Sequence, residues 1–356
     1  MPTIQLISAF LIGLILVYVS IPVIVRISKE KHLYDMPGER RLHKVVVPNL
    51  GGVAIFIGVS IATLLSLHQL EFIEFRYIQA SMIILFFIGI KDDILIISPR
   101  KKFIAQVLCA LILIIPGGIR FTNLHGILGL YEIDYIISVF ISLLAIVSII
   151  NAINLVDGID GLAASIGIFS SIIFGIKFLI TGNEDYAILC SAIIGSLLAF
   201  LWFNVYGKTN KIFLGDTGSL ILGLLISVLV IQYNEFSLLT TPQEISFAPV
   251  FSLAILATPL ADMIRVFAIR IYNGKSPFAP DMNHIHHRLL KLGFSHFNST
   301  LIIVLTNGFI ITLAFAFRFL NKHALMALLI VVIFLLLQLP NIFHKRKQKD
   351  SNTTMT

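Results

Sequence analysis

Long apolar stretches, separated by short polar segments, recur along almost the whole chain. A bilayer core of about 30 Å is spanned by about 20 helical residues, and eleven stretches come close to that length. We therefore expect an all-α fold: a polytopic integral membrane bundle of about eleven transmembrane helices. The stretches are Ile4–Val25, Leu50–Leu67, Tyr77–Ile97, Phe103–Ile119, Tyr135–Leu155, Gly161–Ile180, Tyr186–Phe203, Thr217–Tyr233, Phe247–Ile264, Thr300–Phe319 and Ala324–Pro340.

The composition also indicates a membrane protein. Hydrophobic residues make up 57% of the chain and charged residues 13%, whereas soluble domains average about 45–50% and about 25%. The same numbers exclude disordered, collagen-like and disulfide-scaffold classes. Cys109 and Cys190 lie inside apolar stretches and form no disulfide framework. No basic segment precedes the first stretch, which predicts a retained helix and not a signal peptide.

Lysine and arginine residues are distributed unequally between the two sides of the predicted membrane. One set of loops, together with the C-terminal tail, holds 21 of them, and the other set holds five. The positive-inside rule then places the N-terminus outside and the C-terminus in the cytoplasm. This bias accounts for the net charge of +7, and we expect no nucleic-acid partner. We treat residues 1–343 as one transmembrane domain and residues 344–356 as a basic, polar cytoplasmic tail.

The carboxylates gather at the ends of the predicted helices. An Asp at the centre of a membrane helix costs about 2.5–3.5 kcal/mol, so such residues are usually functional or paired. Four separate segments bring carboxylates to the predicted cytoplasmic side. These residues are Asp92, Asp93, Asp157, Asp160, Asp216 and Asp262.

The adjacent pair Asp92 and Asp93 follows an apolar stretch at the predicted membrane surface. Because neighbouring carboxylates repel each other, the pair predicts a bound cation or a basic partner. The alternative is a solvated helix end paired with Lys91 or Lys102.

The segment 151–161 places two amides, two acids and two glycines between long apolar stretches. On a helix, Asn151, Asn154 and Asp157 share one face, and the glycines that follow allow the backbone to approach a ligand closely. The alternative is a polar cap that joins two membrane spans.

A third segment, Phe213–Ser219, opens a predicted membrane helix with glycines and hydroxyls. A helix N-terminus of this kind is a ready anion site, and Asp216 can hold a metal ion that bridges phosphate oxygens. The alternative is simple N-capping by Asp216 or Thr217.

Two basic loops face the same side. In the later loop, a phosphate clamp of an arginine with histidines is expected, and zinc is disfavoured because no cysteine accompanies the histidines. Its alternative is a solvated basic loop. For the first loop, the positive-inside bias alone is the stronger alternative. The later loop contains Asp281, His284, His286, His287 and Arg288. The first loop contains Arg40, Arg41, His43 and Lys44.

Together these motifs resemble the polyprenyl-phosphate N-acetylhexosamine-1-phosphate transferases, over nearly the whole chain. The resemblance implies that a polyprenyl phosphate attacks the β-phosphorus of a UDP-N-acetylhexosamine and releases UMP. It also implies Mg²⁺, with Mn²⁺ as an alternative, and a cytoplasmic active site in a bacterial inner membrane. The matching positions are Pro37–His43, Pro48–Gly52, Asp92 and Asp93, Asn151–Gly161, Asn204, Phe213–Ser219, Pro259–Arg265 and His284–Arg288.

The resemblance assigns roles residue by residue. The catalytic positions are Asp92, Asp93, Asp157 and Asp160, and the metal positions are Asp216 and Asp93. The nucleotide-sugar positions are Asn154, Asn204, Phe213, Lys44, His284, His286, His287 and Arg288, with Phe213 stacking on the base. Lys102, Asp262 and Arg265 complete the set. The His-Ile-His-His-Arg run, where the MurNAc-pentapeptide branch has three successive histidines, favours UDP-GlcNAc over the peptide-bearing substrate.

Other enzyme and transport classes fit less well. A prenyltransferase would repeat its acids with a DDxxD or NxxxDxxxD spacing, and a CDP-alcohol phosphotransferase would follow Asp157-Gly158 with Ala-Arg. A transporter or lipid flippase would place its acids near the membrane midplane. The sequence leaves open the exact N-acetylhexosamine, the downstream glycan, the lipid length and the oligomeric state, for which a homodimer is one option.

Overall fold

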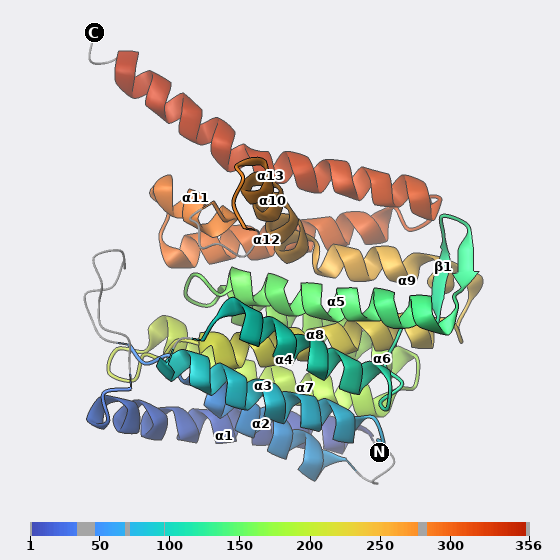
Figure 1. The fold of residues 1–356 in the computed structure, drawn as a ribbon, viewed down its shortest axis with the longest axis horizontal. Coiled ribbons are helices and arrows are strands. Elements are labelled where there is room, and N and C mark those ends of the chain that lie inside the picture. Colours follow the sequence, from blue (N-terminus) through green and yellow to red (C-terminus); the bar gives the residue numbers. More distant parts are fainter. Residues whose placement is uncertain (1, 34–46, 68–71, 96, 277–282, 354–356) are drawn as a thin grey trace.

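The computed structural model describes residues 2–33, 47–67, 72–95, 97–276 and 283–353, and these form thirteen α-helices and one β-hairpin (Figure 1). The helices before the hairpin are α1 (Pro2–Glu30), α2 (Gly51–Ser66), α3 (Phe75–Leu95) and α4 (Pro99–Ile114). The hairpin pairs β1 (Asn123–Ile127) with β2 (Leu130–Glu132). The later helices are α5 (Tyr135–Val156), α6 (Leu162–Ile180), α7 (Glu184–Leu201), α8 (Gly215–Ser237), α9 (Pro242–Ile255), α10 (Ala257–Tyr272), α11 (Ile285–Lys291), α12 (His296–Ala316) and α13 (Lys322–Thr353).

The helical, polytopic membrane class is confirmed. Among the described residues, α1, α5, α6, α7, α8, α12 and α13 are each long and apolar enough to cross a membrane. The bent pair of α9 and α10 makes an eighth candidate. The expected count of eleven is not confirmed, because α2 and α4 have only 16 residues each and α3 ends in charged residues.

Helix α8 lies at the centre of the bundle. Of its most apolar 18 residues, 89% are buried, whereas only 22% of the corresponding 18 residues of α1 are buried. This is expected for a helix that is apolar on all sides. Close backbone contacts fix its N-terminal end against α2 and α3. A Cβ on Gly52 would lie 2.1 Å from the nitrogen of Gly218, and one on Gly89 would lie 2.3 Å from the Cα of Thr217. Only glycine permits these approaches, and they bring α2 and α3 to the N-terminus of α8.

The predicted ninth span is broken into two helices. The axis bends by 72° between α9 and α10. Pro259 has no N–H to continue the helix, and Asn307 of α12 completes the interrupted hydrogen bonding. Its amide nitrogen donates to the carbonyl of Ile255 at 2.8 Å, and its oxygen accepts the N–H of Thr258 at 3.1 Å. The break turns α10 toward α11, at the end of the bundle opposite the hairpin (Figure 1).

Candidate active site

Four helix ends meet at the end of the bundle that carries α11: α3 and α5 finish there, and α4 and α8 begin there (Figure 1). A cavity of about 470 Å³ lies between them. Asp93, Asp157, Asp160 and Asp216 all line it, although they come from three separate segments of the chain. The structure therefore brings together four of the six carboxylates that the sequence places on one side, while Asp92 and Asp262 do not line this cavity.

Asp93 is bound to the N-terminus of α8. Its Oδ1 accepts the N–H of Asp216 at 2.7 Å, and its Oδ2 accepts both the N–H (3.0 Å) and the hydroxyl (2.6 Å) of Thr217. A carboxylate suits this position, because a helix N-terminus exposes unpaired N–H groups and the positive end of the helix dipole. The helix is thus capped by a residue of α3, and not by Asp216 or Thr217 itself.

The side chain of Asp216 is directed toward α4 and α5. Its Oδ1 accepts a hydrogen bond from the amide of Asn154 at 2.7 Å and one from the ammonium of Lys102 at 3.0 Å. Asn154 also donates to the hydroxyl of Ser219 at 2.8 Å. These contacts hold one carboxylate oxygen of Asp216 at the wall of the cavity.

Asp92 lies next to Asp216. Its Oδ2 contacts the ammonium of Lys102, which also lies 3.0 Å from Oδ1 of Asp216, and its Oδ1 accepts the N–H of Ile97 at 2.6 Å. Asp92 is only 7% exposed, so it is not a solvated helix end. The basic partner expected for the acidic pair is Lys102.

The chain leaves α5 through a turn that Asn204 stabilises. Gly161 has a φ of +77°, and its N–H donates to the Asn204 side chain at 2.6 Å. The Asn204 amide nitrogen donates to the carbonyl of Ile212 at 2.8 Å. This buried amide therefore ties the turn after α5 to the segment before α8, and its expected contact with uridine stays a prediction.

Two neighbouring acids in this turn have opposite environments. Burial raises the pKa of Asp157 well above its usual value, and the charges of Asp216, Asp93 and Asp160 raise it further. Among the described residues, no hydrogen-bond partner is found for the Asp157 carboxyl group.

Asp160, in contrast, is paired. Lys211 lies 2.6 Å from its Oδ2, and the Nδ1 of His296 lies 3.5 Å from the same atom. Burial alone would raise the pKa of Asp160, but the hydrogen bonds from His296 and Lys211 outweigh burial and hold the pKa below its usual value. Asp160 is therefore the more acidic of the two groups, and Asp157 the more basic.

Asp262 fixes the start of α11. Its carboxylate accepts the N–H of Ile285 at 3.1 and 3.2 Å, lies 2.9 Å from the Nδ1 of His284, and accepts a hydrogen bond from Arg265 at 2.6 Å. Arg265 also donates to the carbonyl of Asn283 at 2.6 Å. The Asp262 and Arg265 pair therefore positions α11 and its histidines without lining either polar cavity.

His286 packs against the turn after α5. Its ring stacks nearly parallel to that of His284, with 5.7 Å between the centroids, and a Cβ on Gly158 would lie 2.2 Å from its Nε2. Burial lowers the pKa of His286 to about 3, helped by the neighbouring His287 and His284. The ring is therefore neutral at physiological pH.

A second polar cavity, of about 320 Å³, adjoins the first. Lys102, Asn154, Asp157 and Gly158 line both, so the two form one cleft. Phe213 and Asn204 line only the first cavity. His284, His286 and His287 line only the second.

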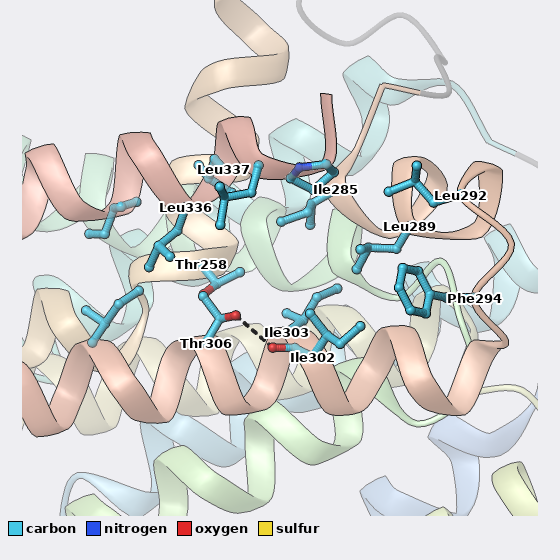
Figure 2. A pocket seen from close by; sticks show the side chains of 14 residues that line it. Thr258, Ile285, Leu289, Leu292, Phe294, Ile302, Ile303, Thr306, Leu336 and Leu337 are labelled. Carbon is cyan, nitrogen blue, oxygen red and sulfur yellow. Dashed lines mark hydrogen bonds between the residues drawn. The ribbon is translucent and has the colours of Figure 1, made fainter. Parts of the chain in front are cut away.

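Helix α11 separates this cleft from an apolar cavity of about 660 Å³ (Figure 2). Ile285 and Leu289 point into the apolar cavity, opposite Ile302 and Ile303 of α12 and Leu336 of α13. The histidines of the same short helix line the polar cleft. One helix thus presents an apolar face to α12 and α13 and a polar face to the carboxylates.

Some predicted site residues are not brought together. Lys44 lies outside the described residues, as do Arg40, Arg41, His43 and Asp281. Arg288 is on α11 but lines neither polar cavity. Conversely, Lys211 and His296 both pair with Asp160 in the cleft, although no motif in the sequence predicts either of them. The position of Lys211, two residues before Phe213, is a weak indication for that residue only.

The chain is similar to known proteins over most of its length. A family model described as "Glycosyl transferase family 4" matches residues 75–234. The chain is 34% identical to a probable undecaprenyl-phosphate N-acetylglucosaminyl 1-phosphate transferase of Bacillus subtilis (strain 168), over 94% of this chain and 90% of the relative. The chain belongs to glycosyl transferase family 4. It is also 29% identical to the undecaprenyl-phosphate alpha-N-acetylglucosaminyl 1-phosphate transferase of Salmonella typhi, over 85% of this chain and 80% of that relative.

Membership in glycosyl transferase family 4 confirms the resemblance seen in the sequence motifs. The segment that matches the family model runs from α3 to α8. It therefore contains the whole carboxylate cluster around α8, whereas the histidines of α11 lie beyond it. The individual roles of these residues within the family 4 site remain predictions.

Proposed function

We propose that the protein transfers GlcNAc-1-phosphate from UDP-GlcNAc to undecaprenyl phosphate and releases UMP. The observation that carries the proposal is the cleft in which α3, α4, α5 and α8 bring four carboxylates and Lys102 together. The relatives from Bacillus subtilis and Salmonella typhi are named for this kind of reaction. In it, an oxygen of the lipid phosphate forms a bond to the β-phosphorus, and the bond from that phosphorus to the bridging oxygen breaks.

Magnesium is proposed as the cofactor, because the acidic groups of the cleft would repel the negatively charged substrates. Both substrates are anionic, and the cleft they would enter is lined by the carboxyl groups of Asp93, Asp157, Asp160 and Asp216. Among the described residues no three potential ligands are already arranged around one point. Magnesium fits this donor set, since it is usually bound through one or two carboxylates together with substrate phosphates. The expected metal positions are Asp216 and Asp93, but both oxygens of Asp93 accept hydrogen bonds from α8. Asp216 together with Asp92 would therefore hold the ion, and it would offset the diphosphate charge.

The two ends of the cleft suggest how the substrates lie. Phe213, Asn204 and the Asp160–Lys211 pair surround the first cavity, which suits a nucleoside with its ring against Phe213. His284, which Asp262 holds, and the neutral ring of His286 line the second cavity, which suits hydroxyl and phosphate oxygens. Asp157 lies between them, and its raised pKa suits proton transfer or the positioning of a phosphate near neutral pH.

The proposal also includes the orientation in the membrane. We infer that the α11 end faces the cytoplasm of a bacterial inner membrane and that α2, α3 and α4 complete eleven passes. The orientation follows from the bias of lysine and arginine toward that end, and eleven passes would place the two termini on opposite sides of the membrane. The helix ends that carry the carboxylates lie at one end of the bundle rather than at mid-depth (Figure 1), which favours an enzyme over a transporter or flippase.

The test is UMP release by the purified protein in detergent, with undecaprenyl phosphate and a panel of UDP-sugars. We expect UDP-GlcNAc to be the best donor, turnover to stop in excess chelator and to return with Mg²⁺ or Mn²⁺. Asp216→Asn should abolish turnover while the protein remains folded, because an amide cannot supply the charge that binds the metal. Turnover that persists in chelator, or no UMP from any UDP-sugar, would refute the proposal.

A further inference from the structure

The ammonium of Lys102 lies between two carboxylates that belong to different helices. It is 3.0 Å from Oδ1 of Asp216 on α8 and contacts Oδ2 of Asp92 on α3. Lys102 itself is in the first turn of α4. A single positive charge therefore joins three helix ends at the centre of the cleft.

These two carboxylates need a cation between them. One ammonium contacts an oxygen of each, so the two carboxyl groups lie close together on either side of it. Like charges this close repel strongly in a partly buried site. Lys102 is the cation that the structure places there.

The side chain of Lys102 can also leave this position. An ammonium is a compact charge on a flexible four-carbon stem, without the fixed fork of a guanidinium. Lys102 lines both polar cavities, whereas Asp216 lines only the first. Rotation about the stem could therefore carry the charge from the carboxylates toward the second cavity.

We propose that Lys102 is an internal counter-ion, which fills the cation position between Asp92 and Asp216 in the free enzyme and yields it to the divalent cation. On yielding, its charge moves to the second cavity and positions a substrate phosphate there. This inference rests on the proposed assignment of Asp92 and Asp216 to the metal. The competing view is that Lys102 is a permanent salt bridge that only fastens α4 to α8.

The two views differ in their effect on metal affinity. We would measure Mn²⁺ binding by electron paramagnetic resonance, with the full-length protein in detergent and without either substrate. If Lys102 competes with the metal, Lys102→Met should bind Mn²⁺ at least about tenfold more tightly than the wild type, because a like charge has been removed from the site. Unchanged or weaker binding by a folded variant would overturn the proposal.

Lys211→Met is the matched control. Lys211 also pairs with a cleft carboxylate, but with Asp160 and not with Asp92 or Asp216, so its loss should leave Mn²⁺ affinity near the wild-type value. Equal tightening in both variants would show a general charge effect and would also overturn the proposal. If Asp216→Asn binds Mn²⁺ as well as the wild type does, the metal assignment itself fails. A wrong choice of sugar substrate changes none of these measurements.

A second measurement uses the wild-type protein and so does not depend on the folding of a variant. The rate at which an amine-reactive ester labels Lys102 would be followed by mass spectrometry, with and without saturating Mg²⁺. An ammonium released from two carboxylates should be labelled several-fold faster when Mg²⁺ is present. An equal or slower rate would show that Lys102 stays between the carboxylates and would overturn the proposal.

Discussion

Asp93 of α3 holds Thr217 of α8 by two hydrogen bonds to one carboxylate oxygen, one from the backbone N–H at 3.0 Å and one from the hydroxyl at 2.6 Å. The two residues are 124 positions apart in the chain. Next to them, Gly89 allows the backbones of the two helices to touch. This contact fixes the N-terminus of α8, and with it the carboxylate of Asp216, relative to α3.

Replacing Asp93 should cost stability. Asp93→Ala removes the cap of α8 and should lower the free energy of unfolding by about 1–2 kcal/mol, measured by thermal unfolding in detergent. Thr217→Val removes only the hydroxyl contact and should cost less. If Asp93→Asn lowers Mn²⁺ affinity far more than Thr217→Val does, Asp93 is a metal ligand as well as a cap. Unchanged stability of Asp93→Ala would contradict the capping role.

Gly158→Ala should damage the cleft, because its Cβ would lie 2.2 Å from the Nε2 of His286. The ring must then leave its stacked position against His284, or the turn after α5 must shift. We expect UMP release to fall by about tenfold or more, since small displacements of positioning groups are costly. Gly308→Ala is the control: its Cβ would meet nothing closer than 3.6 Å, so wild-type turnover is expected. Normal activity of Gly158→Ala would show that His286 need not stay in place.

Asp262→Asn should impair use of the sugar nucleotide. The amide keeps the size of the side chain, but it loses the charge that binds His284 and Arg265 and one of the oxygens that accept the Ile285 N–H. We expect the KM for UDP-GlcNAc to rise about tenfold or more, with a much smaller change for undecaprenyl phosphate, in steady-state kinetics.

A matched control is available for this substitution at the other end of the bundle. Asp134 caps α5 by accepting the N–H of Ile136 at 2.9 Å, on the side of the hairpin. Asp134→Asn makes the same substitution at another helix N-terminus far from the cleft, so its kinetic constants should stay at wild-type values. An equal rise in KM for both variants would mean that lost stability, and not a displaced α11, explains the effect.

His286 should make the protein less stable in acid. Burial holds its pKa at about 3 in the fold, against 6.5 for an ordinary histidine. Between these values the unfolded chain binds a proton that the folded protein does not, so the free energy of unfolding falls as the pH drops below about 6.5.

The expected cost can be measured by comparing two pH values. At pH 5.5 the loss is about 1 kcal/mol, whereas at pH 7.5 it is absent. His286→Gln should therefore lose less thermal stability between pH 7.5 and pH 5.5 than the wild type does, whatever its stability at pH 7.5. An identical loss in the two proteins would show that His286 does not stay neutral in the fold.

The sequence alone was sufficient to establish the membrane class and the segments that carry the chemistry. The lengths of apolar stretches report directly on helices in a bilayer, and charged residues are too costly in lipid to occur there without a reason. For this reason Asp92, Asp157 and Asp216 could be predicted as candidate site residues before their neighbours were known. The family could be identified as well, because its motifs occur in order along the chain.

What the tertiary structure decided is which of these groups touch one another. Asp93 as the cap of α8, Lys102 between Asp92 and Asp216, and Asn307 across the break between α9 and α10 are all contacts between helices far apart in sequence. Local patterns determine where a helix begins and which residues are polar, but not which helix ends become neighbours. That depends on the packing of the whole bundle around α8, which no single stretch of sequence contains.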